Sequence, residues 1–123
     1  MPLYTIRTQD GVLSAEAKAA LAADITEFHC RMASLDKSLV KIVFDDVPPG
    51  GGFVGGVPAE PVILTVLIRD GRSTDYKREM LLGLWTRLQH ATGATDEQLL
   101  VAIEEAPASQ AMEMGQIMPK LEE

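Results

Sequence analysis

Pro2 is the first residue of this sequence that could do chemistry. Once Met1 is removed, Pro2 carries a secondary amine at the chain end, and the charge of that amine depends on burial and on nearby groups. A small second residue taken alone is an ordinary processed N-terminus, so a catalytic role for Pro2 rests on the residues that the fold places beside it.

Two arginines, Arg69 and Arg72, flank a turn just before an expected helix. A helix N-terminus carries partial positive charge and free N–H groups. Two guanidinium groups there would hold a carboxylate with charge-assisted hydrogen bonds of roughly 1.5 to 3 kcal/mol each. A small organic acid is the natural ligand. The alternative is that these arginines form surface ion pairs, which contribute little, with Asp70, Asp75 or Glu79.

His29 and Glu113 are two further candidates. His29 lies at the edge of an apolar stripe next to Phe28, where a side chain can reach from the core to a cleft, although such a histidine is more often structural. Glu113 has apolar neighbours, so desolvation would raise the pKa of its carboxyl group and suit it to acid or base catalysis. The alternative for Glu113 is a solvated glutamate of the tail.

Several other site types are excluded. Gly50 to Gly55 fits the GxGxxG pattern, but the Val57 to Pro61 segment that follows cannot open the helix that a dinucleotide site requires. His29 and His90 are the only histidines and lie on different expected helices, with no zinc-type spacing and no GxSxG elbow. We therefore expect no dinucleotide cofactor, no metal and no serine-hydrolase site.

Four expected strands and two expected helices must position the candidates. The strands are typical apolar, β-compatible runs at Leu3–Arg7, Leu39–Phe44, Val62–Ile68 and Leu99–Ile103. The third run is almost uninterrupted, which favours a central strand buried on both sides. The 45–61 segment is expected to be a long loop, and the tail from Glu105 has no clear period.

The helices follow from apolar stripes with three- and four-residue spacing. Ser14 would cap the first helix, which runs to about Ala33. Ser73 or Thr74 would cap the second, which Gly93 would end. The stripes consist of Ala17, Leu21, Ile25, Phe28 and Met32 in the first helix, and of Tyr76, Met80, Leu84 and Leu88, with Leu81 and Trp85 beside them, in the second.

The order strand, helix, strand occurs twice, so we interpret the chain as one α+β domain with an internal duplication, about 1–59 and 60–123. Asp10-Gly11 matches Asp70-Gly71, and Lys18 matches Lys77. Two βαβ units would share one four-stranded sheet with both helices on one face. The other face would be apolar and bare, which predicts a homo-oligomer.

Composition limits the partners. The formal net charge of -7 opposes binding to nucleic acid or to anionic membranes. Cys30 is the only cysteine, which fits a reducing cytoplasm. The N-terminus lacks the features of a signal peptide, and no apolar run reaches the roughly 18 residues of a membrane span.

The sequence resembles the tautomerase superfamily, in particular its cis-3-chloroacrylic acid dehalogenase branch, across nearly the whole chain. The resemblance rests on five separated segments besides the general pattern. They are Pro2, Ile25 to His29, Phe53 to Val57, Arg69 to Ser73, and Glu105 to Ala108 with Glu113 to Gly115.

The resemblance implies two βαβ units, a homotrimer and no cofactor. It implies Pro2 as acid or base, His29, Arg69 and Arg72 as binders of the substrate carboxylate and carbonyl, and Glu113 as the group that positions or activates water. One family residue is missing, because the branch's dehalogenases carry a tyrosine where this chain has Ala102.

These observations favour a cofactor-independent keto–enol tautomerase acting on a small 2-oxo acid or its enol. Nearby guanidinium charge and desolvation would both favour the neutral Pro2 amine that a base needs. Two alternatives stay open: hydration or hydrolytic dehalogenation of 3-substituted acrylates, and a non-catalytic carboxylate-binding oligomeric module.

Overall fold

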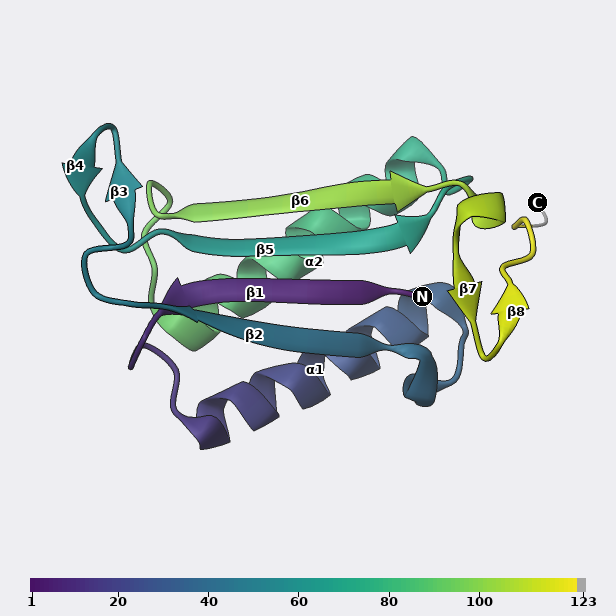
Figure 1. Cartoon of the computed structure of the whole chain (residues 1–123), viewed down its shortest axis with the longest axis horizontal. Coiled ribbons are helices and arrows are strands. Elements are labelled where there is room, and N and C mark those ends of the chain that lie inside the picture. Colours follow the sequence, from purple (N-terminus) through teal and green to yellow (C-terminus); the bar gives the residue numbers. More distant parts are fainter. Residues whose placement is uncertain (122–123) are drawn as a thin grey trace.

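A four-stranded sheet packed against two long helices forms the body of the molecule (Figure 1). The structure is a computed structural model that describes residues 1–121. The sheet has the order β2-β1-β5-β6, formed by β1 (Leu3–Gln9), β2 (Lys41–Val47), β5 (Val62–Arg69) and β6 (Leu99–Ala106). Strands β1 and β2 pair in parallel, as do β5 and β6, and antiparallel pairing of β1 with β5 joins the two pairs. This confirms the predicted α+β fold of two βαβ units.

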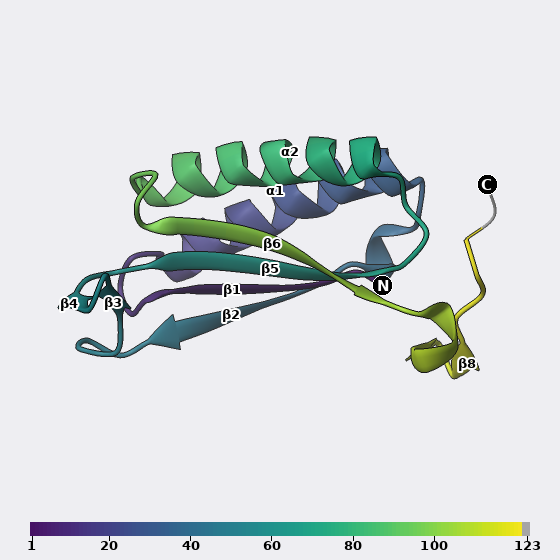
Figure 2. The ribbon, with the colours of Figure 1, turned by 90° about the horizontal axis from the view of Figure 1, so that it is seen from above.

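Helices α1 (Ala15–Ala33) and α2 (Thr74–Thr92) both cover the same face of the sheet (Figure 2). Alternate strand residues such as Tyr4, Ile6, Leu64 and Val66 are fully buried beneath them. The predicted apolar stripes of the two helices form the other side of this core. Their buried members are Leu21, Ile25, Phe28, Met80, Leu84 and Leu88. Burial of these apolar side chains is the main force that holds the two layers together.

The helix ends follow the predicted capping residues. Ser14 and Ser73 each accept a hydrogen bond from a backbone N–H of the first turn, at Ala17 and Tyr76. This satisfies donors that a helix leaves free at its start. Helix α2 ends at Gly93, which has a φ of 70° and bonds back to Gln89, because glycine adopts the left-handed conformation without steric cost.

The second strand lies further along the chain than the predicted Leu39–Phe44. A short 3₁₀ helix, η1 (Lys37–Leu39), occupies the predicted start. Asp36 stabilises it by accepting a hydrogen bond of 2.8 Å from the backbone N–H of Ser38. Strand β2 then continues to Val47 because β1 provides a parallel partner as far as Gln9, so the first residues of the predicted 45–61 loop belong to the sheet.

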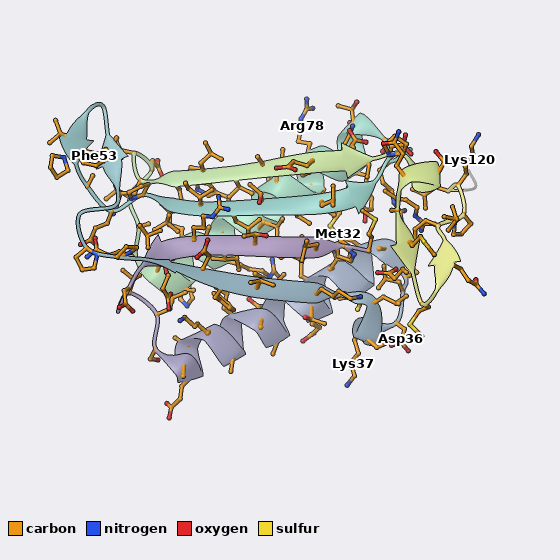
Figure 3. The ribbon with its side chains drawn as sticks, in the orientation of Figure 1. Met32, Asp36, Lys37, Phe53, Arg78 and Lys120 are labelled. Carbon is orange, nitrogen blue, oxygen red and sulfur yellow. The ribbon has the colours of Figure 1, made fainter. Side chains whose placement is uncertain are left out.

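The predicted loop and tail each contain a small hairpin. The loop forms β3 (Phe53–Val54) and β4 (Val57–Pro58), and the tail forms η2 (Ala108–Gln110), β7 (Met112–Glu113) and β8 (Gln116–Ile117). Phe53 and Lys120 mark the opposite ends of the molecule that carry these hairpins (Figure 3). Pairing along such short strands has no clear periodicity in the sequence, which is why both hairpins were missed.

The contacts of the two halves match in detail, which supports our proposal that the chain is one domain built from a repeated unit. Asp10 N donates to Val47 O at 2.8 Å, and Asp70 N donates to Ala106 O at 2.9 Å. Lys18 pairs with Asp46 at 2.7 Å, just as Lys77 pairs with Glu105 at 2.9 Å. Each half also ends in a hairpin.

The sheet face away from the helices is only partly buried. Strand β5 alternates between buried and half-buried residues, so the expectation that it is buried on both sides is wrong for the single chain, because both helices lie on one face. The bare face exposes Leu3, Val43 and Leu100. Within the described residues, no helix has the length and apolar character to cross a membrane.

Candidate active site

The start of the chain lies against the β7-β8 hairpin (Figure 1). The amino group of Met1 forms an ion pair with the Glu113 carboxylate on β7. The ammonium group of Lys41, at the start of β2, lies 3.4 Å from the same carboxylate oxygen. The Glu113 side chain is only 11% exposed, so one nearly buried carboxylate accepts two positive groups.

The pKa of Glu113 is lowered, which corrects the expectation that desolvation would raise it. Burial does oppose ionisation of this carboxyl group, but the hydrogen bonds and positive charges of the chain terminus and of Lys41 outweigh it. Glu113 is therefore an ionised carboxylate at neutral pH.

Pro2 is fully buried at the head of β1. Its carbonyl oxygen accepts a hydrogen bond of 3.1 Å from the backbone N–H of Lys41, which fixes Pro2 at the start of the inner strand β1, next to β2. While Met1 is attached, the Pro2 nitrogen belongs to a peptide bond and has no basic lone pair. Chemistry at Pro2 therefore requires removal of Met1.

His29 lies in the last turns of α1 and is 2% exposed. Its Nδ1 atom is 2.7 Å from the hydroxyl oxygen of Tyr4, and the two rings are nearly perpendicular, at 89°. Burial, together with the positive charges of Arg72 and of the chain terminus, lowers the pKa of His29 to about 4. The imidazole is therefore neutral at physiological pH.

Arg69 and Arg72 lie together at the end of β5 and the start of α2. Within residues 1–121, neither guanidinium forms an ion pair with a carboxylate, so the alternative of surface pairing with neighbouring acids does not describe this structure. Arg69 donates a hydrogen bond of 2.7 Å to the carbonyl oxygen of Pro119. Arg72 stacks over the ring of Tyr76 at 4.6 Å. Both charges remain available to an anion.

A small cavity of about 20 Å³ joins these groups. Its walls are formed by Met1, His29, Ala33, Leu35, Ile68, Arg69, Arg72, Tyr76 and Leu121. A water molecule needs roughly 10–15 Å³ of such space, so the cavity is too small for an organic acid while Met1 occupies it. Larger hollows of about 490 and 510 Å³ lie along the helices, but neither is lined by the chain terminus or by two arginines.

The cavity thus joins three of the predicted site residues, His29, Arg69 and Arg72, to the chain terminus. Glu113 adjoins the cavity through its ion pair with the terminus rather than by lining it. Lys41 was missed because no motif marks a lysine at a strand start. Tyr4 was missed as a partner of His29 because the contact spans 25 residues, and Ala102 lies on β6 opposite Thr65, outside the lining set.

A mixed sheet of two βαβ units, with the chain terminus, a histidine and two arginines around one cavity, is the arrangement of a tautomerase-like protein. A family model described as "Putative oxalocrotonate tautomerase enzyme" matches residues 1–123, and the chain belongs to this family. This confirms the resemblance to the tautomerase superfamily. A search of curated proteins found no match.

Solved structures support the same assignment. The chain is similar to native Ps01740, with 34% identity, a TM-score of 0.87, and coverage of 90% of this chain and 99% of that one. It is also similar to N1, a member of the cis-3-chloroacrylic acid dehalogenase family, with 26% identity, a TM-score of 0.88, and coverage of 96% and 84%. A fused 4-OT solved as an asymmetric trimer shares the fold at 18% identity, with a TM-score of 0.85 and 94% coverage of both chains.

Proposed function

We propose that this protein, once Met1 is removed, is a cofactor-independent keto–enol tautomerase that acts on a small 2-oxo acid or its enol. The observation that carries the proposal is the position of the chain terminus, which lies between an ionised carboxylate, a neutral histidine and two arginines that form no ion pair within residues 1–121. Family membership supports tautomerase chemistry in general, and the choice of substrate rests on the charges of the site.

The site residues divide into binding and proton transfer. Arg69 and Arg72 bind the substrate carboxylate by charge-assisted hydrogen bonds, and His29 contacts a carboxylate or carbonyl oxygen. The Pro2 nitrogen takes the proton from the enol oxygen as the carbonyl forms, and delivers a proton to the adjacent carbon. The amine ends the cycle in the state in which it began, so no other reactant is consumed.

The protonation state of Pro2 decides which reaction the site favours. The guanidinium groups and the desolvation of the cavity favour the neutral amine, which is the base that tautomerisation needs. The Glu113 carboxylate favours the protonated amine, and Lys41 weakens that effect by sharing the same carboxylate oxygen. We infer that these opposing charges leave a usable fraction of neutral amine at neutral pH.

A second candidate is hydration or hydrolytic dehalogenation of a 3-substituted acrylate. The contact of Glu113 with the terminus favours it, because a carboxylate there could direct water to C3 while a protonated Pro2 donates its proton to C2. With a 3-chloro substituent, the adduct then expels chloride and a proton. Ala102, where the branch's dehalogenases have a tyrosine, disfavours this reaction.

We further propose that the protein forms a homotrimer through the bare sheet face. This face exposes apolar side chains on three strands, and a fold neighbour, the fused 4-OT, was solved as a trimer. We also place the protein in the cytoplasm, where its lone cysteine would stay reduced.

The first test is the ultraviolet decay of phenylenolpyruvate with protein whose intact mass confirms the loss of Met1. We expect a rate well above buffer that falls at least 100-fold in Pro2→Ala and in Arg72→Ala. Protein that retains Met1 should be inactive, because its Pro2 nitrogen is an amide.

Two other outcomes would redirect the assignment. Faster chloride release from 3-chloroacrylate than turnover of any enol would favour the dehalogenase. No turnover of either substrate by the processed protein, together with retained binding of pyruvate, would leave the non-catalytic carboxylate-binding module.

A further inference from the structure

A buried hydrogen bond links His29 to Tyr4, two residues after the proposed catalytic proline. Tyr4 is 0% exposed, and its hydroxyl oxygen lies 2.7 Å from His29 Nδ1. Within residues 1–121 this is the only side-chain hydrogen bond of either residue. The proposed reaction uses only the ring nitrogen of His29 that does not contact Tyr4. It therefore gives no role to this hydrogen bond.

The direction of the bond follows from the number of protons. A neutral imidazole has one N–H and one lone pair, whereas a phenol has one O–H. If Nδ1–H were the donor, the Tyr4 proton would be left without an acceptor in a buried site, which costs about 1–3 kcal/mol. If the Tyr4 hydroxyl donates to Nδ1, both groups are satisfied, and the proton of the ring must then lie on Nε2.

The environment keeps both groups in the required protonation states. Burial, followed by the charge of Tyr76, raises the pKa of Tyr4 far above its ordinary value, so the hydroxyl keeps its proton. Burial lowers the pKa of His29, as do Arg72 at the start of α2 and the chain terminus beside β1. No deprotonated phenol or imidazolium therefore competes with this arrangement at neutral pH.

The other ring nitrogen, Nε2, takes no part in the hydrogen bond with Tyr4. His29 is one of the cavity walls, and Nε2 makes no hydrogen bond within the described residues. No buried side-chain nitrogen or oxygen of that part of the chain lacks a partner, so Nε2 cannot be sealed in the core. Because His29 lines this cavity, an N–H on Nε2 would be able to donate into the space that a substrate would fill.

We propose that Tyr4 is a positioning residue that holds His29 in its Nε2–H tautomer and thereby presents one fixed N–H donor to an oxygen of the bound 2-oxo acid. This inference rests on the proposed function for the identity of the ligand. It assigns His29 the role of a donor, never a base, so that Pro2 rather than His29 accepts the proton of the enol. It also requires that the His29 imidazole keep one orientation instead of flipping between two.

The first measurement needs no activity. Long-range ¹H–¹⁵N correlation spectra of the processed wild-type protein report which ring nitrogen of His29 carries the proton. We expect a protonated Nε2 and a hydrogen-bonded, unprotonated Nδ1 at pH 7, and a downfield shift of the Nε2 proton when pyruvate is added. A proton on Nδ1, an imidazolium, or no shift at saturating pyruvate would overturn the proposal.

The second measurement is a double-mutant cycle on phenylenolpyruvate turnover. Tyr4→Phe should lower kcat/KM about tenfold in the wild-type background. It should lower kcat/KM less than twofold in the His29→Gln background, because the glutamine amide supplies an N–H without help from Tyr4. Equal effects in both backgrounds would show that Tyr4 does not act through His29.

Thr8→Val, which removes another buried hydroxyl from β1, is the control and should leave both the rate and the His29 spectrum unchanged. If Tyr4→Phe fails to fold, the wild-type spectrum still decides the tautomer. If the wild type has no turnover, the proposed function fails, whereas the spectrum and its response to pyruvate still test the role of Tyr4.

Discussion

Two positive groups compete for one oxygen of Glu113, and this competition sets the charge around the chain terminus. The terminus and Lys41 both contact Oε2. A carboxylate stabilises the nearest cation, and each further cation reduces that stabilisation. The lysine on β2 therefore controls how strongly Glu113 holds a proton on the amine that Met1 removal creates.

Lys41→Met should slow tautomerisation and shift its pH profile. Without Lys41, Glu113 would favour the protonated form of Pro2, so the rate should rise with pH along a limb displaced to higher pH. Exposed pairs contribute roughly 0.2–1 kcal/mol, so we expect at most a fivefold loss of kcat/KM at pH 7. The check is kcat/KM from pH 5 to 9.

Lys18→Met is the matched control for Lys41→Met, because Lys18 forms an ion pair with Asp46 away from the site. It should leave the pH profile in place. A Lys41→Met profile identical to that of the wild type would show that Lys41 has no influence on Pro2.

His29 should make the protein less stable in mild acid. Its pKa is about 4 in the folded protein and 6.5 when unfolded, so between these values the unfolded chain binds a proton that the folded chain does not. The stabilisation is complete above pH 6.5 and is lost as the pH falls toward 4, amounting to about 2 kcal/mol by pH 5. Urea unfolding at pH 7.5 and pH 5 measures this loss.

His29→Gln removes the titrating group and should reduce the loss between pH 7.5 and pH 5 by about the same 2 kcal/mol. The comparison of the two proteins cancels the carboxylates that titrate in both. Equal losses in wild type and variant would contradict the low pKa of His29.

The sequence predicted which residues gather at the site better than it predicted their charges. Arg69 and Arg72 were recognisable because a strand end and a helix start follow from apolar patterns in the sequence. The direction of the Glu113 pKa shift was wrong, since it depends on Lys41 and on the chain terminus, 72 and 112 residues away. Contacts of that separation leave no trace in local periodicity.

At the scale of the elements, α1 and α2 pack closely where Gly83 faces Phe28. A β-carbon added to Gly83 would overlap Phe28 Cζ and lie 2.6 Å from its Cε1 atom. The ring cannot move freely, because the Arg87 guanidinium covers it at 4.2 Å. The glycine therefore allows the close approach of the two helices, although glycine lowers intrinsic helix stability.

Gly83→Ala should destabilise the protein by about 1 kcal/mol. Overpacking costs roughly 1–3 kcal/mol, while alanine returns about 1 kcal/mol of helix propensity. Thermal unfolding checks the sign, and Gly83→Ala combined with Phe28→Leu should lose less than the sum of the single variants. Thr86→Ala, on the exposed side of α2, is the control and should be neutral or slightly stabilising.

The helices were predicted almost to the residue, because capping serines and long apolar stripes are local signals. The strand ends were predicted less well, since β2 extends to Val47 only through pairing with its partner β1. The two-residue strands of the hairpins are set by turns at Gly55-Gly56 and Met114-Gly115, where φ is positive, rather than by an apolar pattern. Sequence patterns therefore misplaced the strands whose bounds depend on pairing with another strand.

For the whole molecule, the bare sheet face is the surface that association would cover. Leu100 on β6 is 51% exposed on this face, and Leu82 on the outer side of α2 is 66% exposed. Leu100→Lys would place a charge in the proposed interface, where an unpaired buried charge is costly. We expect this variant to sediment as a monomer at micromolar concentration.

Leu82→Lys is the matched control, because it places the same charge on an equally apolar but outward position. It should keep the mass of the wild type in sedimentation equilibrium. A trimeric Leu100→Lys variant, or dissociation caused by Leu82→Lys, would contradict association through the sheet.

The start of the chain and the tail after β8 lie at the same end of the molecule (Figure 1). Met1 and Leu121 both line the cavity, and Arg69 holds the tail through Pro119. An affinity handle fused to the N-terminus would block the amine. The exposed turn after α2, around Gly93 and Thr95, lies at the far end of the sheet and is the better place to attach a handle, a dye or a surface.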